Sequence, residues 1–147
     1  LRETIASDKP VREAGLFGIH GGHINVTDGK YVYMRAPAGE DNKPLFQYTH
    51  MPTHMKHTFP VEELQDIQVA KPFTFTKGCP TMKISSNKGA VKSRAYKFGT
   101  LLYDVQEDPQ QKNPLKDEKI EKQMTEHLVR LMKENDAPEE QYERLGL

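Results

Sequence analysis

The histidines are the residues of this sequence whose type and spacing most suggest chemistry, since all but one of the six fall between His20 and His57. His20 and His23 flank a Gly-Gly pair, and histidine can donate hydrogen bonds to the oxygens of a ligand near neutral pH. The glycines between them would let a large ligand approach the backbone. His54 and His57 lie in a segment rich in Met and Pro, residues 51–60, which we expect to be an irregular loop.

Simpler interpretations of the same histidines stay open. His20 and His23 can be two polar residues at a turn, and the segment of His54 and His57 can be an ordinary surface loop. A transition-metal site at His20 and His23 is a third interpretation, but a closed site needs about four ligands and the sequence indicates no third one. We predict no metal ligand and no catalytic residue, and we name His20, His23, His54 and His57 as candidate substrate-binding residues.

These histidines must be positioned by the segment from Gly15 to Arg35, which has the pattern of a three-stranded meander. Apolar residues alternate on either side of Gly21-Gly22 and Asp28-Gly29, and such pairs favour two-residue hairpin loops. With both loops in place, one face of the sheet carries Phe17, Ile19, Ile24, Val26, Tyr31 and Tyr33. The opposite face then carries Leu16, Val32 and Met34, with His20 and His23 directly across from each other.

The C-terminal third of the chain predicts one long helix, about Glu118 to Glu134, with Asp117 as its N-cap. A stripe at helical spacing forms its buried face: Ile120, Met124, Leu128 and Leu131. A short final helix is expected over residues 138–144. The other expected elements are strands at Leu45–Tyr48, Phe73–Phe75, Thr81–Ile84 and Phe98–Val105, helical turns at Val61–Asp66 beginning with Pro60, and a mobile loop at Ser85–Ser93.

Together these elements predict a single α+β domain over residues 1–147: an antiparallel sheet of about four strands, with the long C-terminal helix packed on one face. The opposite face, with Leu16, Val32 and Met34, is too apolar for a fully solvated surface. We therefore expect it to dock on something absent from this chain. The sequence begins at Leu1 rather than a methionine, which leads us to expect a piece of a longer protein.

Composition excludes some classes of partner. Lys+Arg and Asp+Glu are both 21, and without a positive surplus we predict no nucleic-acid partner. No apolar run approaches a membrane span, so we predict no membrane partner. The single cysteine, Cys79, allows no internal disulfide and is expected to be buried; it permits a cytoplasmic parent without establishing one. A basic stretch from Lys77 to Lys97 is interpreted as a solvated loop, with contact to an anionic substrate as the alternative.

Two motifs give the chain a family resemblance. Gly29-Lys-Tyr-Val-Tyr33, at the end of a hairpin, and Leu102-Tyr-Asp-Val-Gln-Glu-Asp-Pro109, followed by Asn113-Pro-Leu115 and an amphipathic helix, resemble the C-terminal region of sulfatases. Val11–His23 and Asn135–Leu147 are similar to one bacterial branch of that family. The resemblance covers residues 11–147 and implies a small C-terminal sheet that the Leu-Tyr-Asp strand closes before the last helix.

The resemblance further implies a parent enzyme that hydrolyses sulfate esters with a formylglycine nucleophile and a calcium-type divalent cation. Formylglycine arises from the motif Cys/Ser-x-Pro/Ala-x-Arg, whereas this chain has Cys79-Pro-Thr-Met-Lys83, with the proline one place early and a lysine in place of the arginine. We therefore expect the machinery upstream of Leu1, in a missing N-terminal catalytic domain that is this chain's partner. The fragment alone is predicted to hold no cofactor and to be inactive.

The resulting hypothesis is a C-terminal subdomain that completes the fold of a sulfatase and helps shape the cleft for a sulfated substrate. A stand-alone carbohydrate- or protein-binding module is the alternative, although without tryptophan the sequence offers little for sugar stacking. A small metal-dependent enzyme built on the histidines is a third possibility, which a metal analysis of the purified protein would distinguish.

Overall fold

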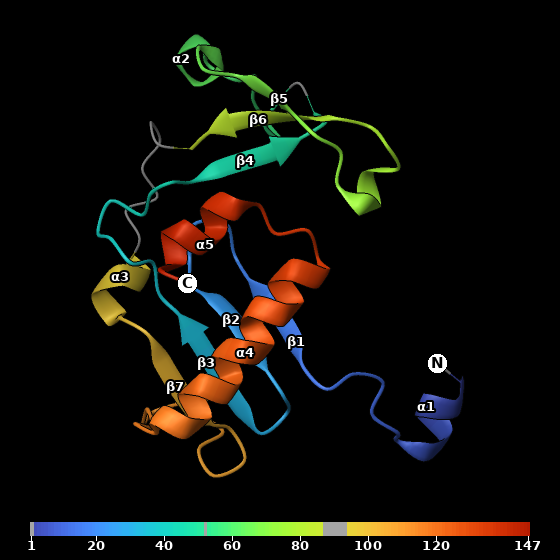
Figure 1. Cartoon of the computed structure of the whole chain (residues 1–147), viewed down its shortest axis with the longest axis vertical. Helices are drawn as coiled ribbons and strands as arrows, with labels where there is room; N and C mark the ends of the chain where they lie inside the picture. The colour runs from blue at the N-terminus through green and yellow to red at the C-terminus, as the bar shows by residue number, and fades with distance from the viewer. Residues whose placement is uncertain (1, 52, 87–93) are drawn as a thin grey trace.

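The computed structural model describes residues 2–51, 53–86 and 94–147, and it contains two antiparallel sheets (Figure 1). The first sheet has four strands in the order β1 (Gly15–Gly18), β2 (Ile24–Thr27), β3 (Tyr31–Arg35), β7 (Leu101–Asp104). The second has three strands in the order β4 (Phe46–Thr49), β6 (Thr81–Ser85), β5 (Gln68–Ala70). The helices are α1 (Arg2–Ser7), α2 (Val61–Leu64), the 3-10 turn η1 (Thr74–Thr76), α3 (Arg94–Phe98), α4 (Glu118–Glu134) and α5 (Glu139–Leu145).

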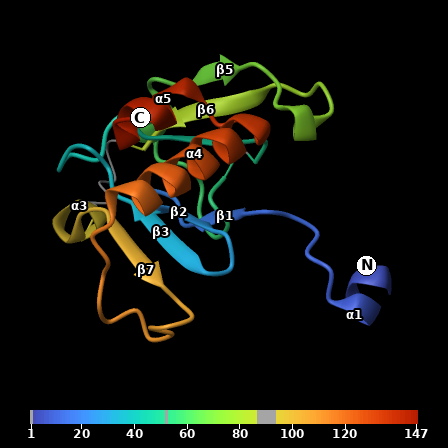
Figure 2. The ribbon, with the colours of Figure 1, turned by 60° about the horizontal axis from the view of Figure 1, so that its bottom comes forward.

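The predicted α+β fold is confirmed in the first sheet, which α4 crosses on one face (Figure 2). Asp117 caps α4, because its Oδ1 accepts hydrogen bonds from the backbone N–H groups of Lys119 and Ile120, each at 3.0 Å. The buried side of the helix is formed by Met124, Leu128 and Met132. It packs on the inner residues of the sheet, Val26, Tyr33 and Leu102.

The predicted register of the first hairpin is wrong by one residue. Leu16, not Phe17, pairs with Val26, so the side chains of β1 point to the opposite faces from those expected. Leu16 packs against the core, whereas Phe17 is 47% exposed and Ile19 is 78% exposed. The cause is the loop: Gly22 N–H donates to Ile19 O, and the connection between the strands spans residues 19–23 rather than two glycines.

The second hairpin is shifted by two residues, which keeps its faces. Val26 pairs with Tyr33 rather than Tyr31, since Asp28 Oδ1 accepts hydrogen bonds from Lys30 N and Tyr31 N and closes a longer turn. In the first hairpin, the connection spans residues 19–23, so His20 and His23 both lie outside the strands. The expectation that they face each other across the sheet is wrong.

Other local expectations are also corrected. Phe73–Phe75 is not a strand but leads into η1, which ends at the left-handed residue Lys77. Phe98 ends α3 instead of beginning the closing strand. Cys79 is exposed rather than buried. The predicted mobile loop falls largely on residues 87–93, which lie outside the described residues.

The short helix α5 lies between the two sheets (Figure 1). Its C-terminal end is joined to β3 by Arg35, whose Nε donates to Leu145 O at 2.9 Å and whose Nη2 donates to Gly146 O at 2.8 Å. A cation at this end also complements the helix dipole. Its N-terminal turn contacts the second sheet through Glu140 and Lys83. The helix thus fixes the space between the sheets in which the candidate site lies.

Candidate functional site: a cleft between the two sheets

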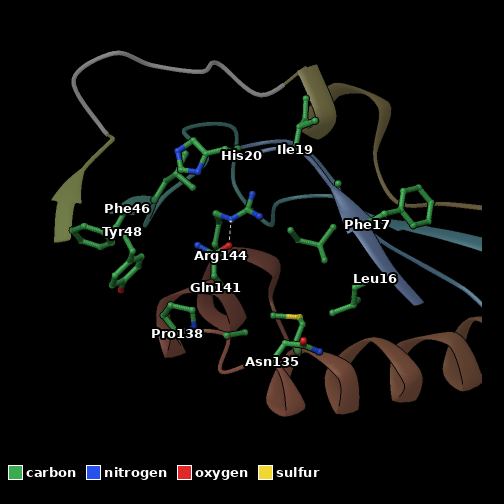
Figure 3. A pocket seen from close by; sticks show the side chains of 16 residues that line it. Leu16, Phe17, Ile19, His20, Phe46, Tyr48, Asn135, Pro138, Gln141 and Arg144 are labelled. Carbon is green, nitrogen blue, oxygen red and sulfur yellow. Dashed lines mark hydrogen bonds between the residues drawn. The ribbon is translucent and has the colours of Figure 1, made fainter. Parts of the chain in front are cut away.

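A cleft of about 390 Å³ opens where the first hairpin loop, β4 and α5 meet (Figure 3). Its lining comes from β1 and the loop that follows it, from the segment that leads into β4, from the end of α4 and from α5. The apolar part of the wall includes Ile19, Leu45, Phe46, Met132 and Pro138. The polar groups that reach the cleft belong mainly to His20, Tyr48, Asn135, Gln141 and Arg144.

Arg144 is the charged group of this cleft, and it is 1% exposed. Its Nε donates to Gln141 Oε1 at 3.0 Å, and its Nη1 donates to Asn42 Oδ1 at 2.8 Å and to Gly22 O at 3.3 Å. Asn42 in turn donates from Nδ2 to Gly21 O at 2.8 Å. The guanidinium therefore connects α5 to the crossover segment and to the histidine-bearing loop.

Every acceptor around this guanidinium is neutral. In the described ranges, Arg144 forms no ion pair, and its Nη2 donates to no protein group. Burial lowers the pKa of Arg144 from its ordinary value, which is the direction expected when a charge is removed from water. Arginine nevertheless stays protonated in proteins, so this side of the cleft carries a positive charge.

His20 lies on the exposed rim of the cleft (Figure 3). Its Nε2 is 3.1 Å from Ser86 Oγ. Partial burial of the ring, followed by the positive charge of Arg144, lowers the pKa of His20 below its ordinary value of 6.5. The imidazole is consequently neutral at pH 7. It can act there as a hydrogen-bond donor or acceptor, but it does not add a second full charge beside Arg144.

The other predicted histidines do not line this cleft. His23 donates from Nε2 to Gly99 O at 2.9 Å, which joins the first hairpin loop to the residue after α3. His54 pairs with Glu63 Oε2 at 2.7 Å and packs against Phe59, with 4.3 Å between ring centroids. His57 is exposed in the loop that precedes α2. The structure therefore separates His20 from His23, and both from His54 and His57.

A polar cluster beside the cleft was not predicted. Tyr48 from β4 donates from its hydroxyl to Glu140 Oε1 on α5, and Lys83 Nζ from β6 lies 3.0 Å from the same oxygen. Burial, followed by the bond to Glu140, raises the pKa of Tyr48 well above its ordinary value. The cluster fixes α5 against the second sheet. Neither Arg144 nor this cluster has a local sequence signal, because their partners are far away in the chain.

An aromatic cluster was also missed. Phe73 and Phe75 stack nearly in parallel, with 5.2 Å between centroids, and Tyr48 meets Phe73 edge-on at 5.1 Å. Phe75 is 70% exposed. Tyr48 reaches the cleft, whereas Phe73 and Phe75 do not line it and lie on the side of the second sheet where η1 is.

For the described part of the chain, no three His, Cys, Asp or Glu side chains are grouped so that they could hold a metal ion. No helix in that part is long and apolar enough to cross a membrane. Comparison of the chain with protein-family models, with curated proteins and with solved structures finds no match.

Proposed function

We propose that this chain is the C-terminal subdomain of a sulfatase, a sulfuric ester hydrolase, in which it completes the fold and helps shape the substrate cleft without being catalytic alone. Its partner is the N-terminal catalytic domain, and the sulfated substrate binds between the two. In that enzyme the formylglycine and the calcium-type cation belong to the catalytic domain.

The pairing of the two family-like motifs carries this proposal. They lie about 70 residues apart in the sequence, yet they pair residue by residue as β3 and β7: Tyr31 with Asp104, Val32 with Tyr103, and Tyr33 with Leu102. This is the arrangement that the resemblance implies, in which the Leu-Tyr-Asp strand closes the sheet before the last helix. Long-range antiparallel pairing of two motif segments supports a shared architecture more strongly than either motif alone.

Residues of the second motif have evident structural tasks. Asp104 Oδ1 accepts hydrogen bonds from the N–H groups of Gln106 and Glu107, and Asp108 Oδ2 accepts from Lys112 and Asn113. These bonds hold the irregular connection to α4. Leu115 N–H then donates to Leu102 O at 2.7 Å, alongside the end of the sheet. The motif thus builds the fold, which agrees with a completing rather than a catalytic role.

The outer face of the first sheet supports a docked partner. By strand alternation it carries Phe17, Asn25, Val32, Met34 and Tyr103. Asn25 is buried, and its Oδ1 has no hydrogen-bond partner among the described residues, while Phe17 is half exposed. Val32 and Tyr103 are already buried within this chain, each 8% exposed, so the accessible part of the face is its β1 edge, where the ring of Phe17 suits contact with another protein surface.

The test uses the longer protein encoded by the source gene. Its sequence upstream of this chain should contain Cys/Ser-x-Pro/Ala-x-Arg. The purified protein should hydrolyse 4-nitrophenyl sulfate, whereas the 147-residue chain alone should not. In the longer protein, His20→Ala should lower kcat/KM roughly tenfold, the effect of losing one substrate hydrogen bond, with an unchanged Tm; His127→Ala on the exposed side of α4 is the control.

One result would contradict the domain assignment, and another would contradict the substrate role of the histidine loop. An initiator methionine directly before Leu1 would remove the catalytic domain from the gene product. Unchanged kinetics in both His20→Ala and His23→Ala would remove the substrate role of the histidine loop while leaving the domain assignment open to the activity assay.

The aromatic cluster favours one second candidate, a carbohydrate-binding module. The exposed ring of Phe75, stacked on Phe73, offers the flat apolar surface on which a sugar ring can lie. In that case the isolated chain would bind oligosaccharides, Phe75→Ala would abolish binding, and Phe98→Ala, which removes another exposed phenylalanine, would not.

A further inference from the structure

Among the residues that the structure describes, no carboxylate forms an ion pair with Arg144. Removing a guanidinium from water is costly unless a counter-charge or a complete set of hydrogen bonds replaces the solvent. Here three of its bonds go to neutral oxygens, on Gln141, Asn42 and Gly22. Among the described residues, the Nη2 group has no acceptor. An anion in the cleft would supply both the missing charge and the missing acceptor.

The walls beside this charge are apolar. In Figure 3, Phe46 lies on one side of Arg144 and Leu16 on the other, with Ile19 above and Pro138 near the N-terminal end of α5. Leu45 also lines the cleft. The volume of about 390 Å³ lies within the range of about 300–1,000 Å³ typical of small-molecule sites. A ligand that fits must therefore combine one anionic group with a compact apolar body.

We propose that this cleft is a binding site for a small amphiphilic monoanion, a carboxylate or sulfate monoester carried on an aromatic or aliphatic group. The anionic oxygens meet Arg144 Nη2, His20 offers a neutral hydrogen-bonding group at the rim, and the apolar body lies against Leu45, Phe46 and Ile19. With one guanidinium and a neutral imidazole, the site matches a single negative charge better than a dianion. The inference concerns this chain alone and does not require the sulfatase assignment.

The experiment titrates the 147-residue chain with three ligands of one shape: 2-naphthoate, 2-naphthyl sulfate and uncharged 2-naphthol. At least one anion should bind roughly ten- to a hundredfold more tightly than 2-naphthol, the ratio expected for a hydrogen bond to a charged group. Binding should shift the Arg144 Nε–H and His20 signals in ¹⁵N-resolved NMR spectra. Binding of 2-naphthoate alone would identify a carboxylate site, and binding of 2-naphthyl sulfate alone a site for sulfate esters.

Two variants distinguish the effect of the Arg144 charge on binding from its effect on folding. Arg144→Gln should remove the preference for anions, whereas Arg130→Gln should keep it, because Arg130 lies on the exposed side of α4 with Glu13 and Glu134. If Arg144→Gln does not fold, three other results test the proposal: the ligand preference of the wild type, its NMR shifts, and the loss of binding in Leu45→Trp, whose larger side chain fills the cleft. Equal affinity for all three ligands, or shifts confined to another surface, would overturn the proposal.

Discussion

Glu140 shows at the residue scale how a charge near the cleft is held. Its Oε1 accepts hydrogen bonds from both Tyr48 and Lys83, and it joins α5 to the second sheet. Burial by itself acts to raise the pKa of Glu140, but the bonds from Tyr48 and Lys83 outweigh it, and the pKa falls below the ordinary 4.5. A carboxyl group with a lowered pKa in the folded state stabilises the fold when it is ionised.

This predicts a pH-dependent cost for Glu140→Gln. At pH 7 the substitution should lower the free energy of unfolding by about 1–2 kcal/mol, since an amide cannot replace a carboxylate between two donors. The contribution is fully present above pH 4.5 and is lost as the pH falls through the lowered pKa, so the two proteins should converge in acid. Urea unfolding at several pH values measures the difference.

Glu139→Gln is the control, because it removes the same charge from the same first turn of α5 at an exposed position. Its unfolding curve should stay close to that of the wild type at every pH. A constant penalty for Glu140→Gln from neutral pH into acid would mean that the ionised carboxylate is not what stabilises the cluster.

Sequence reasoning reached part of the candidate site at this scale. His20 was named as a candidate and does line the cleft. Arg144 could not be found in the same way, because an arginine near the end of a short helix is normally solvated. Its burial depends on Asn42 and Gly22, more than 100 residues away.

At the scale of elements, the first hairpin shows how a loop decides which side chains face the core. The Gly-Gly pair predicts a two-residue loop, but the connection uses residues 19–23. An odd shift in register moves every side chain of a strand to the other face. Leu16 consequently takes the inner position that the glycine pair had assigned to Phe17.

Two substitutions test this register. Leu16→Ala should destabilise the chain by about 2 kcal/mol, because it empties a packed position beside Val26. Phe17→Ala, although it removes the larger side chain, should change the free energy of unfolding by less than about 1 kcal/mol, because the ring is half exposed. Chemical denaturation of both variants gives the order; the reverse order would restore the two-glycine loop.

The predictability of the elements follows the range of the interactions that form them. The bounds of α4 and its cap were predictable because an N-cap and a helical stripe are local patterns. The second sheet was predictable only in part: the expected strands Leu45–Tyr48 and Thr81–Ile84 lie in β4 and β6, whereas β5 and the pairing of the three strands were not expected. The strands of this sheet are short. β6 pairs with both β4 and β5, which a long connection separates in the sequence. Pairing of this kind is decided by tertiary contacts rather than by propensity.

At the scale of the whole molecule, one helix, α5, connects the two sheets. α4 covers the inner face of the first sheet, and α5 is bonded both to β3 through Arg35 and to the second sheet through Glu140. On the outer face of the first sheet Val32 and Tyr103 are buried within the chain, and the half-exposed ring of Phe17 marks the edge suited to another domain. The cleft and the outer face share the strand β1, so a domain docked on that face would lie close to the rim of the cleft.

The isolated chain should therefore show an accessible apolar surface at the Phe17 edge of that face. We expect it to enhance the fluorescence of an apolar-patch dye and to self-associate as its concentration rises, and Phe17→Ser should reduce both effects. Phe75→Ser is the matched control, because that ring is more exposed than Phe17 but lies with the second sheet. Dye titration and analytical ultracentrifugation measure the two effects.

The contrary result is also informative. If Phe75→Ser removes both effects and Phe17→Ser does not, the surface that binds the dye and self-associates is the aromatic cluster. That result would favour the carbohydrate-binding candidate over docking through the first sheet. If the chain stays monomeric and does not enhance the fluorescence of the dye, the outer face needs no partner.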